Sequence, residues 1–451
     1  MLLFNSLTKK KETFKPQEGS VVTMYSCGPT VYASATIGNL RAYLFTDVLK
    51  KTLKLHGFLL RDVINITDVG HLQSDADDGD DKMEVAAKKQ KTTPEQIAAR
   101  YTDEFFADCA LLNIDLSTTK IAKATDYVPH MIEHIRGLEL GGFTYLTSDG
   151  VYFDSAKFPN YYALSGKKGD GDKAGVRVSL GEKKNPNDFA LWKFTPPTAL
   201  QKWDSPWGVG CPGWHIECSA IIRAELGDTI DIHTGGVDHI HIHHTNEIAQ
   251  TEALTNKPFV RFWMHNEFVK VNNTKMSKSL GNAYTLGDLV ARGFNPMAFR
   301  YFVLGAHYKT ILNFTWEALE GAQRAYNNLV KRLSKLTGDE ASPLHREKFI
   351  EFLADDLNTP KALALLWEVE DYNQAIEFDK VLGLGLREAV EEFSTKTQDV
   401  APQDVVALAE QRHTAKQAKD WVASDKIREQ VRGLGWEIID KKDGFALVKK
   451  P

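Results

Sequence analysis

Residue types that commonly hold a transition metal stand in three separated segments of the chain. Cys27 follows a short apolar run, Cys218 lies in GWHIECSA, and the segment HIHHTNE carries His243 and Glu247. His243 and Glu247 are four residues apart, so a helix would place them on one face. His244 is three residues from Glu247, and the spacing alone does not choose between the two histidines. Thiolate, imidazole and carboxylate groups together suit zinc, so these segments predict a zinc site.

A pair of lysines with small polar neighbours occurs in the string VNNTKMSKSLGN. Lys275 and Lys278 stand three residues apart within it. A loop of this composition can close over a triphosphate and neutralise the charge that develops as pyrophosphate leaves. An isolated KxxK pair is more often a solvated basic turn, but the complete string KMSKSLGN is far more specific.

The string TIGN, residues Thr36–Asn39, stands before an expected helix and could contact a nucleotide. Gly38 would let an adenine ring approach the backbone closely. Thr36 and Asn39 can donate hydrogen bonds to phosphate oxygens, and a helix start also offers free backbone N–H groups. By itself TIGN could be an ordinary tight turn. A position at the first strand–helix connection of a βαβ unit would favour nucleotide binding instead.

The elements expected around TIGN form a βαβ unit. Residues 20–28 and 59–67 have the apolar and β-branched composition of strands, and residues 40–56 have helical periodicity. A strand, a helix and a second strand in this order indicate a parallel, Rossmann-like sheet. The acidic residues 69–83 predict an exposed loop, and the polar residues 165–187 predict an irregular insertion.

Helical periodicity dominates the chain from about residue 284 onward. We expect helices within 282–304, 316–336, 355–378 and 405–434, and strands only at 436–449. No internal repeat is found.

The composition is that of a folded protein with several domains. The chain has 451 residues, of which 43% are apolar and 25% charged, with a net charge of −5. An acidic total argues weakly against a general nucleic-acid coat protein but allows a local basic face. No run of about 18 uncharged apolar residues and no signal-peptide pattern occurs, so we expect no membrane association and a cytoplasmic location. Four cysteines indicate no disulfide framework.

Together, these strings resemble the cysteinyl-tRNA synthetases, a branch of the class I aminoacyl-tRNA synthetases. The resemblance rests on YSCGPTVY, NITDVGH, PGWHIECSA, HTGGVDH, HIHHTNEIAQ and KMSKSLGN, and it continues through DDLNTPKAL and AKDWVASDKIREQVRGLGWEIID. It implies an α/β fold with a Rossmann-like parallel sheet split by an insertion, then an α-helical body and a small C-terminal anticodon-binding domain.

The resemblance also divides the chain into six parts. The Rossmann catalytic domain would comprise residues 1–125 and 206–265, separated by a connective insertion at 126–205. The parts that follow are the KMSKS loop with stem-contact helices at 266–335, a helical bundle at 336–400 and the anticodon-binding domain at 401–451.

The activity implied is that of a cysteine–tRNA ligase. Such an enzyme uses ATP, with magnesium, to convert L-cysteine to cysteinyl-adenylate, and then transfers cysteine to the 3′ end of tRNA(Cys). One zinc ion per chain would select cysteine, because a soft thiolate binds zinc well while a serine hydroxyl stays protonated. We expect a monomer without an editing domain.

The resemblance assigns roles to individual residues. The zinc ligands would be Cys27, Cys218, His243 and Glu247, the first histidine of the pair being the choice of the family. The catalytic residues would be Thr36, Asn39, Lys275 and Lys278. ATP would be bound by Gly38, Gly236 and Lys278, and cysteine by Thr67, Trp214 and Asp238.

Three features depart from the pattern of the family. TIGN stands where most class I enzymes carry HIGH, although related tryptophanyl enzymes have a similar TxGN form, so we expect tuned rather than absent catalysis. The acidic segment after NITD is longer than in many members. Cys211 replaces a basic residue common there, and we expect it to be a bystander thiol.

The sequence leaves two rival functions open. The first is a ligase that transfers activated cysteine to an amino sugar; such relatives usually alter the first lysine of the loop, whereas Lys275 is intact and an anticodon-type tail is present. The second is a catalytically inactive RNA-binding homologue, supported only by the loss of both histidines in TIGN.

Overall fold

The computed structural model describes residues 1–70, 82–166, 182–277, 280–338, 341–398, 401–441 and 444–449. The chain divides into two compact units, one formed by residues 1–326 and 338–384 and the other by 327–337 and 385–451. Most of the expected acidic loop, most of the expected irregular insertion, and Lys278 lie outside the described residues.

A five-stranded parallel sheet lies at the centre of the first unit. Its order is β11-β10-β3-β4-β5, and every neighbouring pair is parallel. The consecutive elements β3, α1 and β4 form the expected βαβ unit, so the Rossmann-like prediction is confirmed. The bounds are β3 (Val21–Ser26), α1 (Ile37–Leu55), β4 (Leu59–Ile66), β5 (Lys120–Lys123), β10 (Ile230–Gly236) and β11 (Val260–Asn266).

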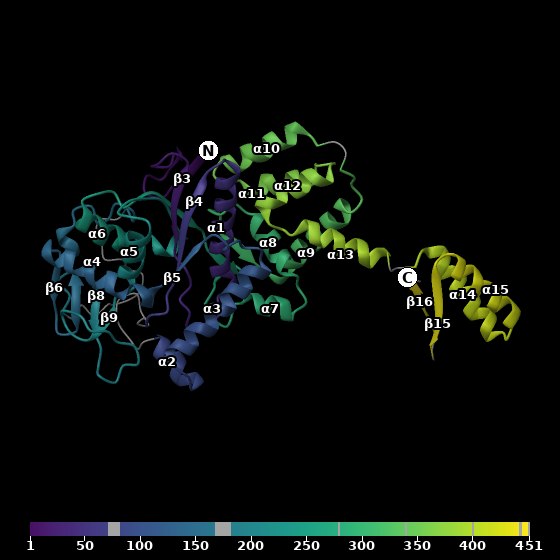
Figure 1. Ribbon diagram of the computed structural model, residues 1–451, viewed down its shortest axis with the longest axis horizontal. Helices are drawn as coiled ribbons and strands as arrows, with labels where there is room; N and C mark the ends of the chain where they lie inside the picture. The colour runs from purple at the N-terminus through teal and green to yellow at the C-terminus, as the bar shows by residue number, and fades with distance from the viewer. Residues whose placement is uncertain are drawn as a thin grey trace. The chain divides into compact units, whose positions relative to one another are not determined.

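Helices cover both faces of this sheet (Figure 1). Alternate strand residues point to opposite faces, so Tyr25 and Val63 enter one apolar core while Met24 and Ile64 enter cores on the other side. The first core is closed by α4 (Val128–Leu140), α5 (Trp214–Glu225) and α6 (His243–Thr255). The opposite face is covered by α1 and α3 (Pro94–Leu111), the latter preceded by α2 (Lys82–Gln90).

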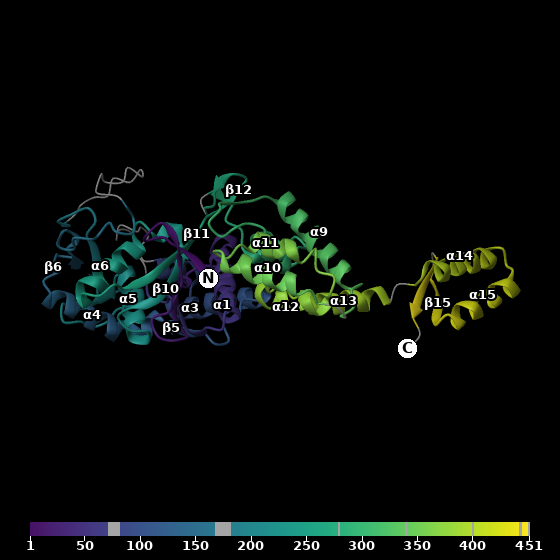
Figure 2. The ribbon, with the colours of Figure 1, turned by 90° about the horizontal axis from the view of Figure 1, so that it is seen from above.

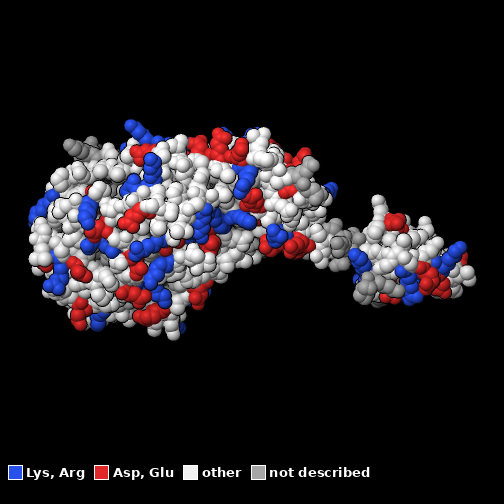
Figure 3. Space-filling view, turned by 45° about the horizontal axis from the view of Figure 1, so that its top comes forward, with Lys and Arg blue, Asp and Glu red and all other residues white. Residues whose placement is uncertain are grey.

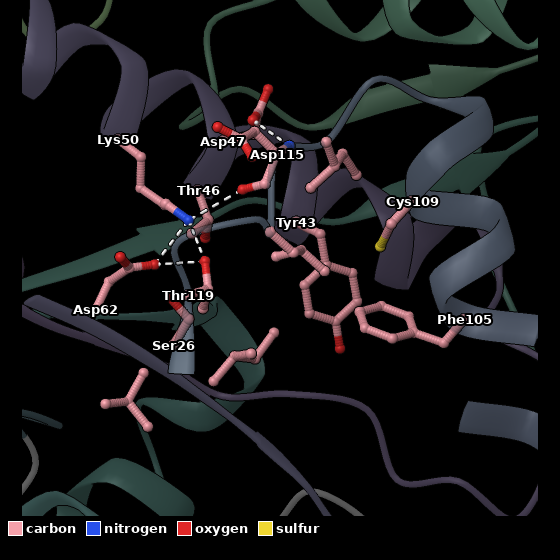
Figure 4. Close-up of a pocket in the computed structure, with 14 residues that line it drawn as sticks. Ser26, Tyr43, Thr46, Asp47, Lys50, Asp62, Phe105, Cys109, Asp115 and Thr119 are labelled. Atoms are coloured by element: carbon pink, nitrogen blue, oxygen red, sulfur yellow. Dashed lines mark hydrogen bonds and ion pairs between the residues drawn. The ribbon is translucent and has the colours of Figure 1, made fainter. Parts of the chain in front are cut away.

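Helix α1 is held against the sheet by a buried ion pair (Figure 4). Lys50 Nζ lies 2.7 Å from Asp62 Oδ2 on β4, and both side chains are almost fully buried. Lys50 also donates to Thr119 Oγ1 at 2.5 Å, and Thr119 donates in turn to Asp62 Oδ2 at 2.7 Å. Burial of this charged pair is tolerated because the lysine ammonium and the Oδ2 atom of Asp62 both keep hydrogen-bond partners.

The insertion between β5 and β10 contains an antiparallel four-stranded sheet. Its strands are β6 (Thr144–Leu146), β7 (Gly150–Phe153), β8 (Phe189–Phe194) and β9 (Gly210–Pro212). We expected the insertion to be loop-rich and to end at residue 205, whereas β9 lies beyond that point because Cys211 pairs with Lys193. Three of these four strands have only three or four residues, which is too short to show a period in the sequence.

A smaller three-stranded sheet, β13-β12-β14, follows the central sheet in the chain. Strands β12 (Val269–Val271) and β13 (Thr274–Lys275) form a hairpin whose turn residues Asn272 and Asn273 both have positive φ. Asparagine tolerates this conformation better than most residues, which suits a tight hairpin turn. Strand β14 (Leu312–Phe314) pairs with β12 in parallel, so the reading that strands reappear only at 436–449 is wrong.

The remaining elements are mostly helical, as expected for the second half of the chain. The first unit also contains the hairpin β1 (Leu2–Asn5) and β2 (Lys10–Thr13), and the helices α7 (Leu286–Ala291), α8 (Pro296–Leu304), α10 (Pro343–Ala354), α11 (Thr359–Leu365) and α12 (Tyr372–Leu382). Helix α9 (Trp316–Leu333) ends within the residues of the second unit, and α13 (Leu386–Gln398) belongs to that unit.

The end of the second unit has an apolar core of its own. Helices α14 (Gln403–Gln417) and α15 (Trp421–Gly433) pack with the hairpin β15 (Trp436–Lys441) and β16 (Gly444–Lys449) (Figure 2). The expected strands at 436–449 are therefore confirmed. No helix of the described residues is both long and apolar enough to span a bilayer.

Asp108 on α3 predicts a pH-dependent stability. Burial, with a smaller contribution from Glu104, raises the pKa of Asp108 to about 6, so the folded chain holds this proton more tightly than the unfolded chain. The stability contributed by protonation is present at low pH and is lost as pH rises from about 4 to about 6. Asp108→Asn should therefore raise the thermal midpoint above pH 6, with a gain that shrinks toward pH 4.

The exposed Asp103 on the same helix provides the matched control. Asp103→Asn should shift the midpoint little at any pH. A gain for Asp108→Asn that does not vary between pH 4 and 8 would contradict the assigned cause.

Candidate functional site

The predicted metal ligands meet at the carboxyl end of the central sheet. Cys27 directly follows β3, and its backbone N–H donates to the carbonyl of Thr234 on β10 at 3.2 Å. From β3 the chain proceeds to β4 and β5 on one side, whereas β10 and β11 lie on the other side. Such a reversal of strand order leaves a crevice at the carboxyl ends, where ligands of open α/β sheets bind.

Cys27, Cys218, His243 and Glu247 form one compact cluster. One ligand atom from each lies within 4.8 Å of the others. His243 Nε2 is 3.5 Å from Cys218 Sγ and 2.7 Å from Glu247 Oε1, which confirms that His243 and Glu247 share one face of α6. The chemistry and burial of these donors fit a zinc ion.

A second set of donors shares two members with the first. Cys27, His233, His244 and Glu247 also offer ligand atoms within 4.8 Å of one another. His244 Nε2 is 3.3 Å from Cys27 Sγ, and His233 Nε2 is 2.8 Å from Glu247 Oε2. The backbone thus brings both histidines of the pair to the site, and geometry alone does not exclude His244.

The charges of the cluster favour binding of a cation. Burial opposes ionisation of Cys218, but a hydrogen bond from Cys27 and the neighbouring His243 outweigh it and lower the thiol pKa to about 6. Burial likewise acts to raise the pKa of Glu247, but His233 and His243 hold it well below its usual value. Burial acts to lower the pKa of His243, yet Glu247 and Cys218 raise it to about 10. A metal bound by His243 must therefore displace a proton.

Further aromatic side chains orient the two histidines of α6. His243 Nδ1 lies 3.0 Å from His215 Nδ1, and His244 Nδ1 lies 2.7 Å from His265 Nε2. Such contacts to the second ring nitrogen fix the orientation of a metal-binding imidazole. Close packing also explains Gly235, since a Cβ there would lie 2.7 Å from the His244 ring.

The expected cysteine-pocket residues surround this cluster to different degrees. The Trp214 ring centroid is 4.6 Å from that of His243, and the buried Thr67 donates to Glu217 Oε2 at 2.9 Å. Asp238 follows β10, and its side chain is 61% exposed. At Gly236 an added Cβ would lie 2.3 Å from Asp238 Oδ1, so this glycine lets the Asp238 side chain lie close to the backbone.

TIGN starts α1 with a closed capping box. Thr36 is the N-cap, its Oγ1 accepts from the Asn39 backbone N–H at 3.3 Å, and its own N–H donates to Asn39 Oδ1 at 3.0 Å. Thr36 Oγ1 also donates to Asn39 Oδ1 at 2.7 Å. The two side chains thus pair with each other, an arrangement that we did not expect. Among the described residues the Asn39 amide nitrogen has no hydrogen-bond partner, so it can still donate to a ligand.

The KMSKS segment begins on β13 and packs on TIGN. A Cβ on Gly38 would be 3.5 Å from Met276 Sδ, an ordinary contact, so this packing alone does not require glycine. Asn282 closes the loop: its side chain accepts from the Ser277 N–H at 2.8 Å and donates to the Lys275 carbonyl at 3.1 Å. The two signature segments are therefore neighbours, as a shared nucleotide site requires.

Several site residues were not assigned a role from the sequence. His233, His265 and Glu217 lie at the cluster, and Asn282 holds the loop. His244 was the alternative that the spacing left open, and the density of histidines between 233 and 244 was a usable signal for His233. His265 and Glu217 had none, because each depends on which strands and helices become neighbours.

Residues 13–324 match the family described as the class I (C) catalytic domain of tRNA synthetases. Cysteine–tRNA ligase 1 of Burkholderia lata is 43% identical, covering 99% of this chain and 96% of that protein. Cysteine–tRNA ligase of Treponema denticola is 40% identical and covers 99% of both chains.

The fold is also similar to that of a solved structure. Mycobacterium tuberculosis methionyl-tRNA synthetase in complex with methionyl-adenylate has a TM-score of 0.54 at 15% identity, covering 92% of this chain and 90% of that one. At this identity the likeness concerns the fold alone.

Proposed function

The chain belongs to the cysteine–tRNA ligases of the class I aminoacyl-tRNA synthetases, and on this premise we propose that it joins L-cysteine to tRNA(Cys) with a zinc ion selecting the amino acid. It is a ligase of the aminoacyl-tRNA synthetase type. The cluster of Cys27, Cys218, His243 and Glu247 beside Trp214 carries the finer proposal. His243 rather than His244 completes the set, because it lies near the thiol of Cys218 and so gives the site two sulfur ligands.

Zinc would address a selection that shape alone cannot make. Cysteine and serine differ by one atom, and an apolar pocket distinguishes near-isosteres by only about 10–200-fold. A bound zinc ion supplies an acceptor that prefers a soft thiolate and lowers the pKa of a thiol. The residues of this chain would hold the ion, and Trp214, Thr67 and Asp238 would form the remaining walls of the cysteine pocket.

The chain itself would contribute positioning and charge to the reaction. The cysteine carboxylate attacks the α-phosphate of ATP, and pyrophosphate leaves. The start of α1 with Asn39 would bind phosphate oxygens, while Gly38 and Gly236 would approach the nucleotide. Lys275 and Lys278 would neutralise the charge on the departing pyrophosphate, which magnesium accompanies. A terminal ribose hydroxyl of the tRNA then attacks the acyl carbon and releases AMP.

The tRNA would be bound by the second half of the chain. We propose that residues 401–451 bind the anticodon and residues 266–335 contact the stem, in keeping with the six-part division above. Acidic and basic side chains are interspersed on the face drawn in Figure 3, so local basic groups rather than the net charge would bind RNA. The monomeric state and the cytoplasmic location stay predictions.

Two assays on one preparation test the function. Cysteine-dependent exchange of pyrophosphate into ATP should occur, which an inactive RNA-binding homologue would not support. Purified tRNA(Cys) should then accept cysteine, whereas an amino sugar should not. Exchange without tRNA charging, together with transfer to the sugar, would favour the rival ligase.

Thr36→Ala should affect both stability and activation. Loss of the cap should cost about 0.5–2 kcal/mol of stability. Adenylate formation should also slow, by roughly 1–3 kcal/mol in activation free energy if a phosphate contact depends on this pair. Thermal unfolding and pyrophosphate exchange measure the two effects.

Thr93→Ala provides the matched control. Thr93 caps α3 with the same kind of capping box, formed with Gln96. Its loss should lower stability similarly without slowing exchange. If Thr36→Ala and Thr93→Ala supported pyrophosphate exchange at the same rate, TIGN would serve only as a structural turn.

Deleting residues 401–451 should separate activation from tRNA use. These residues contain the core formed by α14, α15 and their hairpin, so cysteine-dependent exchange should persist. The tRNA concentration needed for half-maximal charging should rise steeply, because anticodon contacts would be lost. If the truncated protein charged limiting tRNA as fast as the full chain does, residues 401–451 would have a role other than anticodon binding.

A further inference from the structure

Arg41, on the second turn of α1, is buried in an unusual environment. Its side chain is 1% exposed, yet among the described residues it forms no ion pair, and all its hydrogen-bond acceptors are backbone carbonyls. Burial lowers the pKa of the guanidinium to about 10, which still leaves it charged at neutral pH. A buried charge of this kind needs dense hydrogen bonding to be tolerated.

Five carbonyls provide that bonding, and they lie in two separate segments. One nitrogen of Arg41, Nη1, donates to Glu267 and Phe268, each at 2.8 Å. The other, Nη2, donates to Thr310 at 2.6 Å and to His307 and Tyr308, each at 3.3 Å. The planar guanidinium thus bridges residues 267–268 and 307–310.

These two segments are the chain immediately before β12 and β14. Since β12 and β14 are parallel, their amino-terminal ends lie together, and Arg41 binds at that end of the small sheet. Two backbone hydrogen bonds reinforce the junction, from the Glu267 N–H to the Tyr308 carbonyl at 2.8 Å and from the Leu312 N–H to the Phe268 carbonyl at 3.0 Å.

The small sheet carries the first lysine of the KMSKS loop. Strand β12 turns at Asn272 and Asn273 into β13, where Lys275 pairs with Lys270. After the loop, the Tyr284 carbonyl accepts from the N–H of Ile37 at 2.8 Å, next to Thr36. Both ends of the loop are therefore tied to the first two turns of α1, the end that begins with TIGN.

We propose that Arg41 is a positioning residue that clamps the KMSKS hairpin to the TIGN helix, so that Lys275 on β13 is held next to the phosphates bound there. This inference rests on the proposed adenylate chemistry of the same site. Arg41 does not touch the substrate; it acts through the backbone on which Lys275 is mounted. Displacement of a charged group by about 1 Å can slow a reaction about 100-fold, so the position of the hairpin that carries Lys275 matters for the rate.

Arg41→Lys tests the clamp, with Arg300→Lys as the matched control. Lysine keeps the charge but has a single nitrogen, which cannot span two segments as the guanidinium does. Arg300 is also fully buried and donates to the carbonyls of Leu112, Asn113 and Leu382, but it pairs with Asp47 farther along α1. Both variants should lower the thermal midpoint.

Only Arg41→Lys should change the loop and the rate. We expect kcat for cysteine-dependent exchange to fall about 10- to 100-fold with the KM for cysteine unchanged, and trypsin to cleave after Lys275 faster than in the wild type. Arg41→Met should show a larger effect in the same direction, and Arg41→Lys alone decides the outcome if the methionine variant does not fold. Equal kcat losses in Arg41→Lys and Arg300→Lys, or an unchanged kcat in Arg41→Lys, would overturn the positioning role.

The rate of cleavage by trypsin tests the role of Arg41 independently of the proposed function. If the wild-type protein supports no exchange with cysteine, the proposed function fails. Cleavage after Lys275 that is no faster in Arg41→Lys than in the wild type overturns the clamp whatever the activity.

Discussion

Cys218→Ser is expected to lose both the bound metal and the preference for cysteine over serine. The thiol of Cys218 lies beside His243 and has the lowered pKa, about 6, of a group ready to bind a cation. A serine hydroxyl stays protonated and is a poor zinc ligand. Replacing a residue that only hydrogen-bonds a metal ligand already lowers metal affinity or activity by about 10–100-fold. Replacing a ligand itself should therefore lower kcat/KM for cysteine by more than about 100-fold.

Cys109→Ser is the control for this experiment. Cys109 is equally buried, but it lies on α3 among apolar side chains and outside both metal sets. Its replacement should cost stability without changing metal content per folded chain. A Cys218→Ser protein that keeps one zinc ion and full cysteine activation would contradict the assignment of this ligand.

Lys278→Ala is expected to slow adenylate formation by about 100- to 1,000-fold with little change in cysteine binding. The resemblance of KMSKSLGN to the class I signature carries this prediction, since Lys278 itself lies outside the described residues. Its charge would act mostly when pyrophosphate leaves, and interactions made only in the transition state lower kcat rather than raise KM. Exchange kinetics at varied ATP and cysteine concentrations provide the measurement.

Lys270→Ala controls for the loss of a positive charge near the loop. Lys270 pairs with Lys275 across the same hairpin, so removing it changes the local charge equally. Its effect on kcat should be small. Equal kcat losses in both variants would indicate a general electrostatic effect instead of a specific contact by Lys278.

The βαβ unit and the meeting of the four candidate ligands could be predicted because their signals are local or chemically rare. Strands β3 and β4 are runs of six and eight residues rich in apolar and β-branched side chains, and helix α1 shows helical periodicity within its nineteen residues. Cysteine, histidine and glutamate in distinctive strings point to a metal wherever the fold places them. The neighbourhood of His243 and Glu247 also follows from helical spacing alone.

Other features depend on contacts between distant segments. Arg41 looks like an ordinary helix residue until residues 267–268 and 307–310 are brought to it. The pairing of β12 with β14 joins residues more than forty apart, and each strand has only three residues. The capping box of TIGN is locally encoded, since Thr-x-x-Asn resembles the Ser/Thr-x-x-Glu pattern, although both side chains were assigned from the sequence to phosphate oxygens only.

X-ray absorption at the zinc edge, with and without cysteine, tests most directly whether the metal selects the substrate. The zinc-loaded protein should show two sulfur neighbours, from Cys27 and Cys218, together with nitrogen and oxygen from His243 and Glu247. Cysteine should add one sulfur neighbour, and serine at the same concentration should add none. A metal whose neighbours are unchanged by saturating cysteine, in a protein that still activates cysteine, would contradict selection by direct coordination.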